Sequence, residues 1–191
     1  IAKLLIEFGA KYDLFDLIKM NDLTKIKELI ASGIDLNIQN SDGKNPLRYA
    51  LKRRDIEIAK LLIEFGAKYD LFDLIRMNDL TKIKELIANG ININIQNTKG
   101  ETLLIVATKY NHIKLTKLLI QSGADLNIQS NIGYTALMYS LELGEVQIAK
   151  LLIQSGSSLK IKNHSGFNAK RFALRTCYPE MYNLFTNIRK R

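Results

Sequence analysis

The chain has 191 residues, of which 47% are hydrophobic and 25% charged, and its formal net charge is +9. This composition is typical of a folded protein, and no apolar run approaches the roughly 18 residues of a membrane-spanning helix, which excludes that class. A single cysteine, Cys177, excludes an internal disulfide framework, and two histidines, His112 and His164, give no ligand set for a metal. We therefore expect no cofactor.

Two spacings organise the chain from its first residue. Residues 1–40 recur as residues 58–97 with four differences, so thirty-six of forty positions match at an offset of 57. A fixed period of this kind indicates a repeat protein. Glycines that follow apolar runs are 24, 33, 24, 33 and 33 residues apart, at Gly9, Gly33, Gly66, Gly90, Gly123 and Gly156. The basic unit is therefore 33 residues, and two units are nine residues short.

Within each unit the pattern predicts two helices followed by a polar loop. In residues 58–65 the apolar side chains follow the i, i+3, i+4, i+7 spacing of an amphipathic helix. Another helix precedes each such run, for example over residues 102–110 and 135–143. The glycine after each run supplies the left-handed conformation that ends a helix. The next apolar residue is expected to pack back on that helix, as Ile91 on Leu86. The sequence therefore predicts an all-α fold of stacked helix–turn–helix units.

These units resemble ankyrin repeats. The resemblance rests on Gly133-Tyr134-Thr135-Ala136-Leu137 at a helix start, Leu118-Leu119-Ile120-Gln121-Ser122-Gly123 at a helix end, and Ala124-Asp125-Leu126-Asn127 after that glycine. It covers essentially the whole chain, although the family's Thr-Pro-Leu-His motif is altered, for example to Asn45-Pro46-Leu47-Arg48. The resemblance implies an ankyrin-type solenoid that forms one array over residues 1–191. Its units are approximately 1–13, 14–39, 40–70, 71–96, 97–129, 130–162 and 163–191.

The resemblance also assigns the polar loops to hairpins that project from the stack, called fingers here. Fingers are expected at residues 34–45, 91–101, 124–134 and 157–167. The junctions at 9–14 and 66–71 should lack them, because the chain enters the next helix almost directly after Gly9 and Gly66. Asp70, which stands immediately before an apolar run, is predicted to cap the start of that helix.

Both ends of the array are irregular. The chain begins inside a helix whose partner helix is absent, so we expect a fragment of a longer array that starts in mid-repeat. Residues 163–191 keep the repeat phase and are predicted to form a terminal cap, with helices over 167–176 and 179–187. Alternatively, residues 178–185 resemble the short F-box at the C-terminus of poxvirus ankyrin proteins, which would make the chain a substrate adaptor of a ubiquitin ligase.

The positive charge is concentrated at the C-terminal end. Residues 1–159 carry twenty basic and eighteen acidic side chains, whereas residues 160–191 carry eight basic side chains and one acidic side chain, Glu180. A basic surface of this kind can bind nucleic acid or an anionic membrane, or it can be a solvated cap on the array. The candidate patch consists of Lys160, Lys162, Lys170, Arg171, Arg175, Arg189, Lys190 and Arg191.

No constellation of residues suggests an enzyme. Cys177 has no nearby histidine in sequence to activate it, and Ser140 lies in a predicted helix without the turn that exposes a nucleophilic serine. The glycines are isolated and repeat with the architecture, so they form no phosphate-binding loop.

The remaining candidate for function is a surface that binds a partner protein. The resemblance places partner contacts on the concave face, which the finger tips and the first helix of each unit form. Tyrosines there suit a binding site because large, stiff side chains dominate interface energetics, although Tyr49 and Tyr139 could instead fill space between units. In the last unit, Phe167 and Phe172 occupy matching positions. The candidate residues are Lys44, Tyr49, Lys52, Arg53, Lys99, Glu101, Lys109, Tyr110, Ile132, Tyr134, Tyr139 and Glu142.

The predicted function is therefore a non-enzymatic module that binds an unidentified protein in the cytoplasm. Isoleucine outnumbers valine 25 to 2, a bias that indicates an AT-rich genome such as that of a giant virus, an intracellular bacterium or a protist. In the first two cases the partner is expected to be a protein in the cytosol of a host cell.

Overall fold

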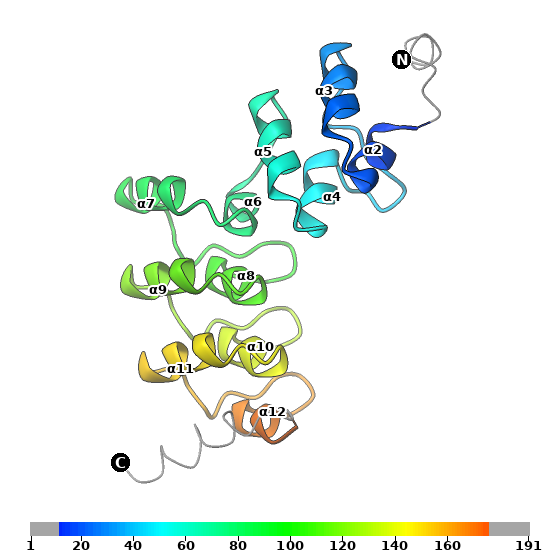
Figure 1. Ribbon diagram of the computed structural model, residues 1–191. Helices are drawn as coiled ribbons and strands as arrows, with labels where there is room; N and C mark the ends of the chain where they lie inside the picture. The colour runs from blue at the N-terminus through cyan, green and yellow to red at the C-terminus, as the bar shows by residue number, and fades with distance from the viewer. Residues whose placement is uncertain (1–11, 176–191) are drawn as a thin grey trace. The chain divides into compact units, whose positions relative to one another are not determined.

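The computed structural model describes residues 12–175. The regular secondary structure in this part of the chain consists of α-helices (Figure 1). The predicted all-α repeat fold is confirmed. Two compact units make up the chain, residues 1–77 (unit 1) and residues 78–191 (unit 2), and each is described by itself. The predicted start of the array, the helix over 179–187, the F-box-like segment, Cys177 and the basic residues Arg189, Lys190 and Arg191 lie outside the described residues.

The described part of unit 1, residues 12–77, contains two helix pairs and a further helix. The pairs are α2 (Leu14–Met20) with α3 (Leu23–Ala31), and α4 (Pro46–Lys52) with α5 (Ile56–Glu64), and α6 (Leu71–Arg76) follows them. Helix α2 packs against α3 and α4, and α4 packs against α5 and α6. The first helices of successive repeats are therefore neighbours, as stacking of the units requires.

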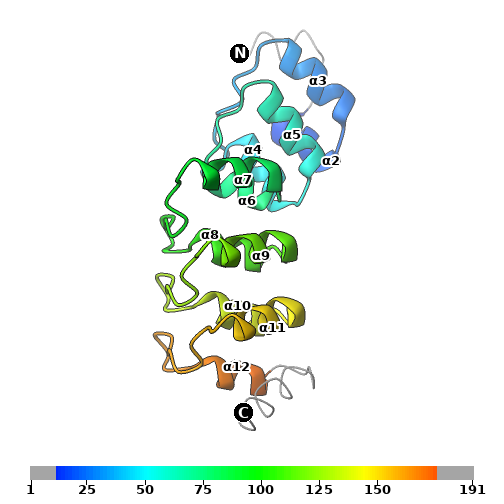
Figure 2. The same ribbon diagram turned by 90° about the vertical axis from the view of Figure 1, so that its left-hand side faces the viewer.

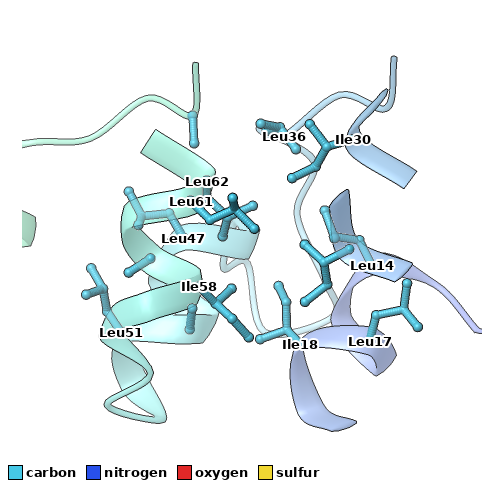
Figure 3. Packing of buried hydrophobic residues seen from close by; sticks show 14 of the residues in the cluster. Leu14, Leu17, Ile18, Ile30, Leu36, Leu47, Leu51, Ile58, Leu61 and Leu62 are labelled. Atoms are coloured by element: carbon cyan, nitrogen blue, oxygen red, sulfur yellow. The ribbon is translucent and has the colours of Figure 1, made fainter. Parts of the chain in front are cut away.

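Apolar side chains from α2, α3, α4 and α5 meet in one cluster inside unit 1 (Figure 3). Ile18 of α2, Leu47 of α4 and Ile58 of α5 are fully buried there. Burying one such side chain contributes about 1.5–3 kcal/mol. Because the cluster draws on two helix pairs, neither pair could bury its apolar face alone.

Unit 2 repeats this arrangement in a more regular form. Helix α8 packs against α9 and α10, and α10 packs against α11 and α12, while α9 packs against α7 and α11. Figures 1 and 2 both show the finger loops of this unit leaving from the same side of the stacked helices. The helices described in this unit, up to residue 175, are α7 (Leu80–Ala88), α8 (Leu103–Lys109), α9 (Ile113–Gln121), α10 (Ala136–Glu142), α11 (Val146–Gln154) and α12 (Ala169–Arg175).

Local hydrogen bonds fix where the helices begin and end. The predicted cap at Asp70 is confirmed, because its carboxylate accepts a bond from the Asp73 backbone N–H at 2.9 Å and the Asp73 carboxylate accepts one from the Asp70 N–H at 3.0 Å. At the end of α7, the N–H of Ile91 donates to the Leu86 carbonyl at 3.2 Å. This bond is the one expected when a left-handed glycine, here Gly90, ends a helix.

In unit 2 the fingers close on themselves and on one another. The N–H of Ser130 donates to the Tyr134 carbonyl at 2.9 Å and closes one finger. Neighbouring fingers are joined by the Gln129 side chain, which donates to the Lys162 carbonyl at 2.9 Å, and by the His164 N–H, which donates to the Ile132 carbonyl at 3.3 Å. These bonds satisfy backbone groups that a loop would otherwise leave to solvent.

A further set of hydrogen bonds joins an asparagine side chain of one repeat to the backbone of the next repeat. The side-chain oxygen of Asn94 accepts a bond from the Asp125 N–H at 2.9 Å, and that of Asn127 accepts one from the Ser158 N–H at 2.8 Å. The same bond is present in unit 1, where no finger separates α5 from α6: Asn37 accepts from the Lys68 N–H at 3.0 Å. The short junction at 66–71 therefore lacks a finger but retains this hydrogen bond between repeats.

Two glycines at equivalent places in unit 2 differ in what surrounds them. Both have a left-handed backbone, with φ of +79° at Gly133 and +78° at Gly166. A Cβ atom at Gly133 would lie 2.7 Å from the backbone nitrogen of His164 and 2.9 Å from the Cα atom of Asn163, whereas a Cβ at Gly166 would meet nothing within 4 Å. Of these two glycines, Gly133 is thus the one needed for the close approach of a second finger.

We predict that Gly133→Ala destabilises the chain more than Gly166→Ala. Both substitutions carry the backbone penalty of a left-handed alanine, about 1–2 kcal/mol, but only Gly133→Ala also displaces the neighbouring finger, at a further cost of about 1–2 kcal/mol. Urea unfolding of the two variants measures the difference. Equal losses in the free energy of unfolding would show that finger packing does not contribute.

Candidate binding face

In each repeat of unit 2 that has a described finger, the finger base contacts the last turn of the helix that follows it. The Lys109 ammonium lies 2.5 Å from a carboxylate oxygen of Glu101. In the next repeat the Tyr134 hydroxyl donates to Glu142 at 3.1 Å, and each of these pairs spans eight residues. The helices are seven residues long, about 10 Å, which two long side chains can bridge.

Aromatic rings connect these pairs from one repeat to the next. The Tyr134 ring centroid lies 4.9 Å from that of Tyr139 on α10 and 5.2 Å from that of Phe172 on α12. The Lys109 ammonium lies over the Tyr139 ring, 5.0 Å from its centroid. The ring centroids of Phe172 and Phe167 are 6.4 Å apart, in an edge-on contact. Side chains of α8, α10 and α12 thus form one continuous row with the finger bases. We call it the finger face of unit 2, made of Glu101, Lys109, Tyr134, Tyr139, Glu142, Phe167, Arg171, Phe172 and Arg175.

Members of this row differ in how far they reach the solvent. Tyr139 and Phe172 are only 8% and 4% exposed, so both fill space between repeats and hold their neighbours in place. Tyr134 is half-buried, and the neighbouring Ile132 is 54% exposed. Tyr134 and Ile132 are therefore accessible to a partner, whereas Tyr139 is largely covered. Direct contact of any of the three with a partner stays a prediction.

Glu101 is a buried carboxylate whose charge is compensated. Burial opposes its ionisation, but hydrogen bonds from the Lys109 ammonium and from the Asn97 side chain, at 3.0 Å, outweigh that effect and lower the pKa of Glu101 below its ordinary value of 4.5. A carboxylate with a lowered pKa stabilises the folded chain above its unfolded pKa, and this contribution is lost as the pH falls through the folded pKa.

We predict that Glu101→Gln lowers the free energy of unfolding at pH 7 by about 1–2 kcal/mol, because the hydrogen bond to a charged partner is lost. The difference from the unchanged chain should shrink as the pH falls below about 4.5, the ordinary pKa of a glutamate in the unfolded chain, because protonation then favours the unfolded chain until the folded pKa of Glu101 is also passed. Urea unfolding at a series of pH values measures it. A difference that stays constant down to pH 3 would contradict the charge-based explanation.

The predicted site residues of unit 1 form a separate group. Lys44 pairs with Asp42 at 2.8 Å, the Tyr49 ring lies 5.6 Å from that of Phe15 in an edge-on contact, and Arg53 donates to the Lys19 carbonyl at 3.0 Å. Lys52 is exposed. The Tyr49 contact joins α4 to α2 and is thus a packing contact within unit 1.

Two further predicted residues lie in unit 2 outside the row. Lys99 is exposed on its finger. Tyr110 follows α8, and its ring centroid lies 5.8 Å from that of His112. The structure thus brings Glu101, Lys109, Tyr134, Tyr139 and Glu142 into one row.

An ionic cluster at the short junction of unit 1 was missed by the sequence analysis. Asp73 is fully buried, yet its carboxylate lies 2.6 Å from Arg76 and 3.8 Å from Arg48, which also contacts Asp70 at 2.7 Å. Burial raises the pKa of the Asp73 carboxyl, and the two arginines oppose that effect. The capping role of Asp70 was visible in the sequence, but the approach of Arg48 from α4 depends on how the helices stack.

Five residues of the predicted basic patch are described, and all five are exposed: Lys160, Lys162, Lys170, Arg171 and Arg175.

Between residues 12 and 175, no group of three or more histidine, cysteine, aspartate or glutamate side chains could hold a metal ion. No helix in that part of the chain is both long enough and apolar enough to cross a membrane.

Comparison with known proteins gives the same family for both units. Residues 71–163 match a model of ankyrin repeats in three copies, and residues 14–63 match a model of ankyrin repeats in many copies.

Three relatives illustrate how widely the similarity extends. An ankyrin repeat protein of Acanthamoeba polyphaga mimivirus is 30% identical over 49% of this chain, and one of Rickettsia felis is 42% identical over 25% of it. Ankyrin repeat domain-containing protein 46 of Rattus norvegicus is 31% identical over 46%. The chain spans only 14%, 23% and 41% of these relatives, respectively.

Proposed function

Since the chain belongs to the ankyrin repeat family, whose repeats generally mediate protein–protein interaction without catalysis, we propose that it binds a partner protein through the finger face of unit 2. The proposal adds a location to the general role of the family. It places the contact on the side chains that the finger bases and the first helices present together.

The observation that carries this proposal is the row of aromatic rings from Tyr139 through Tyr134 to Phe172. Buried members of the row fix the half-buried Tyr134 from two sides, and the Glu142 carboxylate accepts a hydrogen bond from its hydroxyl. A side chain that is already held in place loses little conformational entropy on binding. Beside it, the exposed Ile132 provides apolar area for a partner to cover.

The similarity to a mimivirus protein and the isoleucine-rich composition support a partner in a host cell. In this proposal the chain acts in the cytosol of that cell and binds a host protein.

Replacing the accessible side chains together tests the proposed face. We predict that the double variant Ile132→Ala with Tyr134→Ala loses capture of the partner from a host-cell lysate, because each interface hot spot contributes about 2 kcal/mol or more. A matched control on α9, Ile113→Ala with Lys117→Ala, removes an apolar and a charged side chain that also reach the solvent. The control should capture the same protein as the unchanged chain.

Circular dichroism separates loss of binding from loss of folding in this experiment. The double variant should keep its helical signal and unfold cooperatively, because Ile132 is exposed and Tyr134 is half-buried. Capture that persists in the folded Ile132→Ala, Tyr134→Ala variant, or that is lost equally in the α9 control, would place the binding site elsewhere.

A further inference from the structure

The last repeat of unit 2 differs from the others in its charge. Residues 160–175 contain five basic side chains and no aspartate or glutamate. All five are exposed, and within the described part of the chain none of them makes an ion pair. Lys109, two repeats earlier, is by contrast neutralised by Glu101. Among the cations of the finger face, Arg171 and Arg175 are thus the two that have no acidic partner within residues 12–175.

Two of these cations are held on an aromatic ring. The guanidinium carbon of Arg171 lies 4.1 Å from the Phe167 ring centroid, and that of Arg175 lies 5.9 Å from the same centroid. Phe167 contacts Phe172, which is buried against Tyr134. The platform beneath the two arginines is therefore anchored in the packing between repeats.

This arrangement leaves the hydrogen-bonding groups of the arginines available. A guanidinium that contacts an aromatic ring through its face keeps its N–H donors at the edge. Those donors match the two oxygens of a carboxylate. Arg171 and Arg175 are four residues apart on α12 and share one side of the helix, so two carboxylates could bind side by side.

The neighbouring repeat restricts what kind of anion fits. Glu142 is exposed beside Tyr134 and would repel a uniform polyanion that continued along the row. Ile132, on the same finger as Tyr134, is instead suited to an apolar side chain. A peptide fits this pattern better than nucleic acid or an anionic membrane does. Nucleic acid contacts proteins through many phosphates in a row, and an anionic membrane is uniformly charged.

We propose, on the basis of the proposed function, that the end of the finger face binds an acidic linear segment of the partner protein. Two carboxylates of the segment bind Arg171 and Arg175 above Phe167, and an adjacent apolar side chain lies toward Ile132 and Tyr134. The arginines supply the charge preference, and the aromatic platform fixes their positions.

The test uses the full chain and a fluorescein-labelled peptide of alternating glutamate and leucine, Glu-Leu-Glu-Leu-Glu, measured by fluorescence anisotropy. The matching Gln-Leu-Gln-Leu-Gln peptide keeps the apolar side chains and removes the charges. Arg171→Gln with Arg175→Gln is expected to weaken binding of the acidic peptide about tenfold or more, since truncating a paired charge raises the off-rate.

A control variant carries the same change in net charge at another place. Lys114→Gln with Lys117→Gln removes two exposed cations from α9 and is expected to change the affinity less than about twofold, because exposed distant charges are screened by salt. Phe167→Leu keeps an apolar side chain under the arginines but removes the aromatic ring, and it should give an affinity between those of the unchanged chain and the double arginine variant.

Several results would overturn the inference. They are equal binding of the glutamate and glutamine peptides, an unchanged affinity in the folded double arginine variant, an equal loss in the α9 control, and tighter binding of a dT oligonucleotide or of phosphatidylserine vesicles than of the acidic peptide.

Partner capture separates this inference from the proposed function. If the tyrosine and isoleucine changes abolish capture while the arginine changes do not, the finger face binds the partner but the acidic segment is wrong. If capture survives the tyrosine and isoleucine changes, the proposed function fails, and the peptide measurement still decides whether α12 binds carboxylates.

Discussion

The structure depends on the requirement that each repeat bury its apolar face against the next one. A single helix pair cannot form a core of its own, so the chain is stable only where neighbouring repeats pack in register. In unit 2 the register is fixed by finger bonds such as that from Gln129 to the Lys162 carbonyl and by the close approach of His164 to Gly133. Equivalent positions of successive repeats therefore fall next to one another, and a row of side chains becomes a surface.

The chemistry of that row changes from repeat to repeat while the backbone stays the same. The two positions that join the finger base to the helix end hold Glu101 with Lys109 in one repeat and Tyr134 with Glu142 in the next. The row therefore passes from a neutralised ion pair to an accessible carboxylate and ends at the cations of α12. Specificity for a partner can arise from such differences without any change of fold.

How much the sequence predicts depends on the range of the interaction. The alternation of two helices and a polar loop, the cap at Asp70 and the helix end at Gly90 follow from bonds between residues close in sequence, and the described part of the structure confirms them. The burial of Tyr139 and the approach of Arg48 to the buried Asp73 depend on packing between helices, which one sequence does not reveal. Comparing equivalent positions offers a partial signal, because Asp73 stands in a first helix at the place of the buried Tyr139 and Phe172.

We propose that the finger face of unit 2, and not the layer formed by α7, α9 and α11, is the binding surface. Backbone amide chemical shifts of the nitrogen-15-labelled chain, titrated with the Glu-Leu-Glu-Leu-Glu peptide, test this most directly. We expect saturable changes in residues 130–134, 163–167 and 169–175, with α9 and α11 unaffected. Changes concentrated on α9 and α11, or small changes spread evenly over both layers, would contradict it.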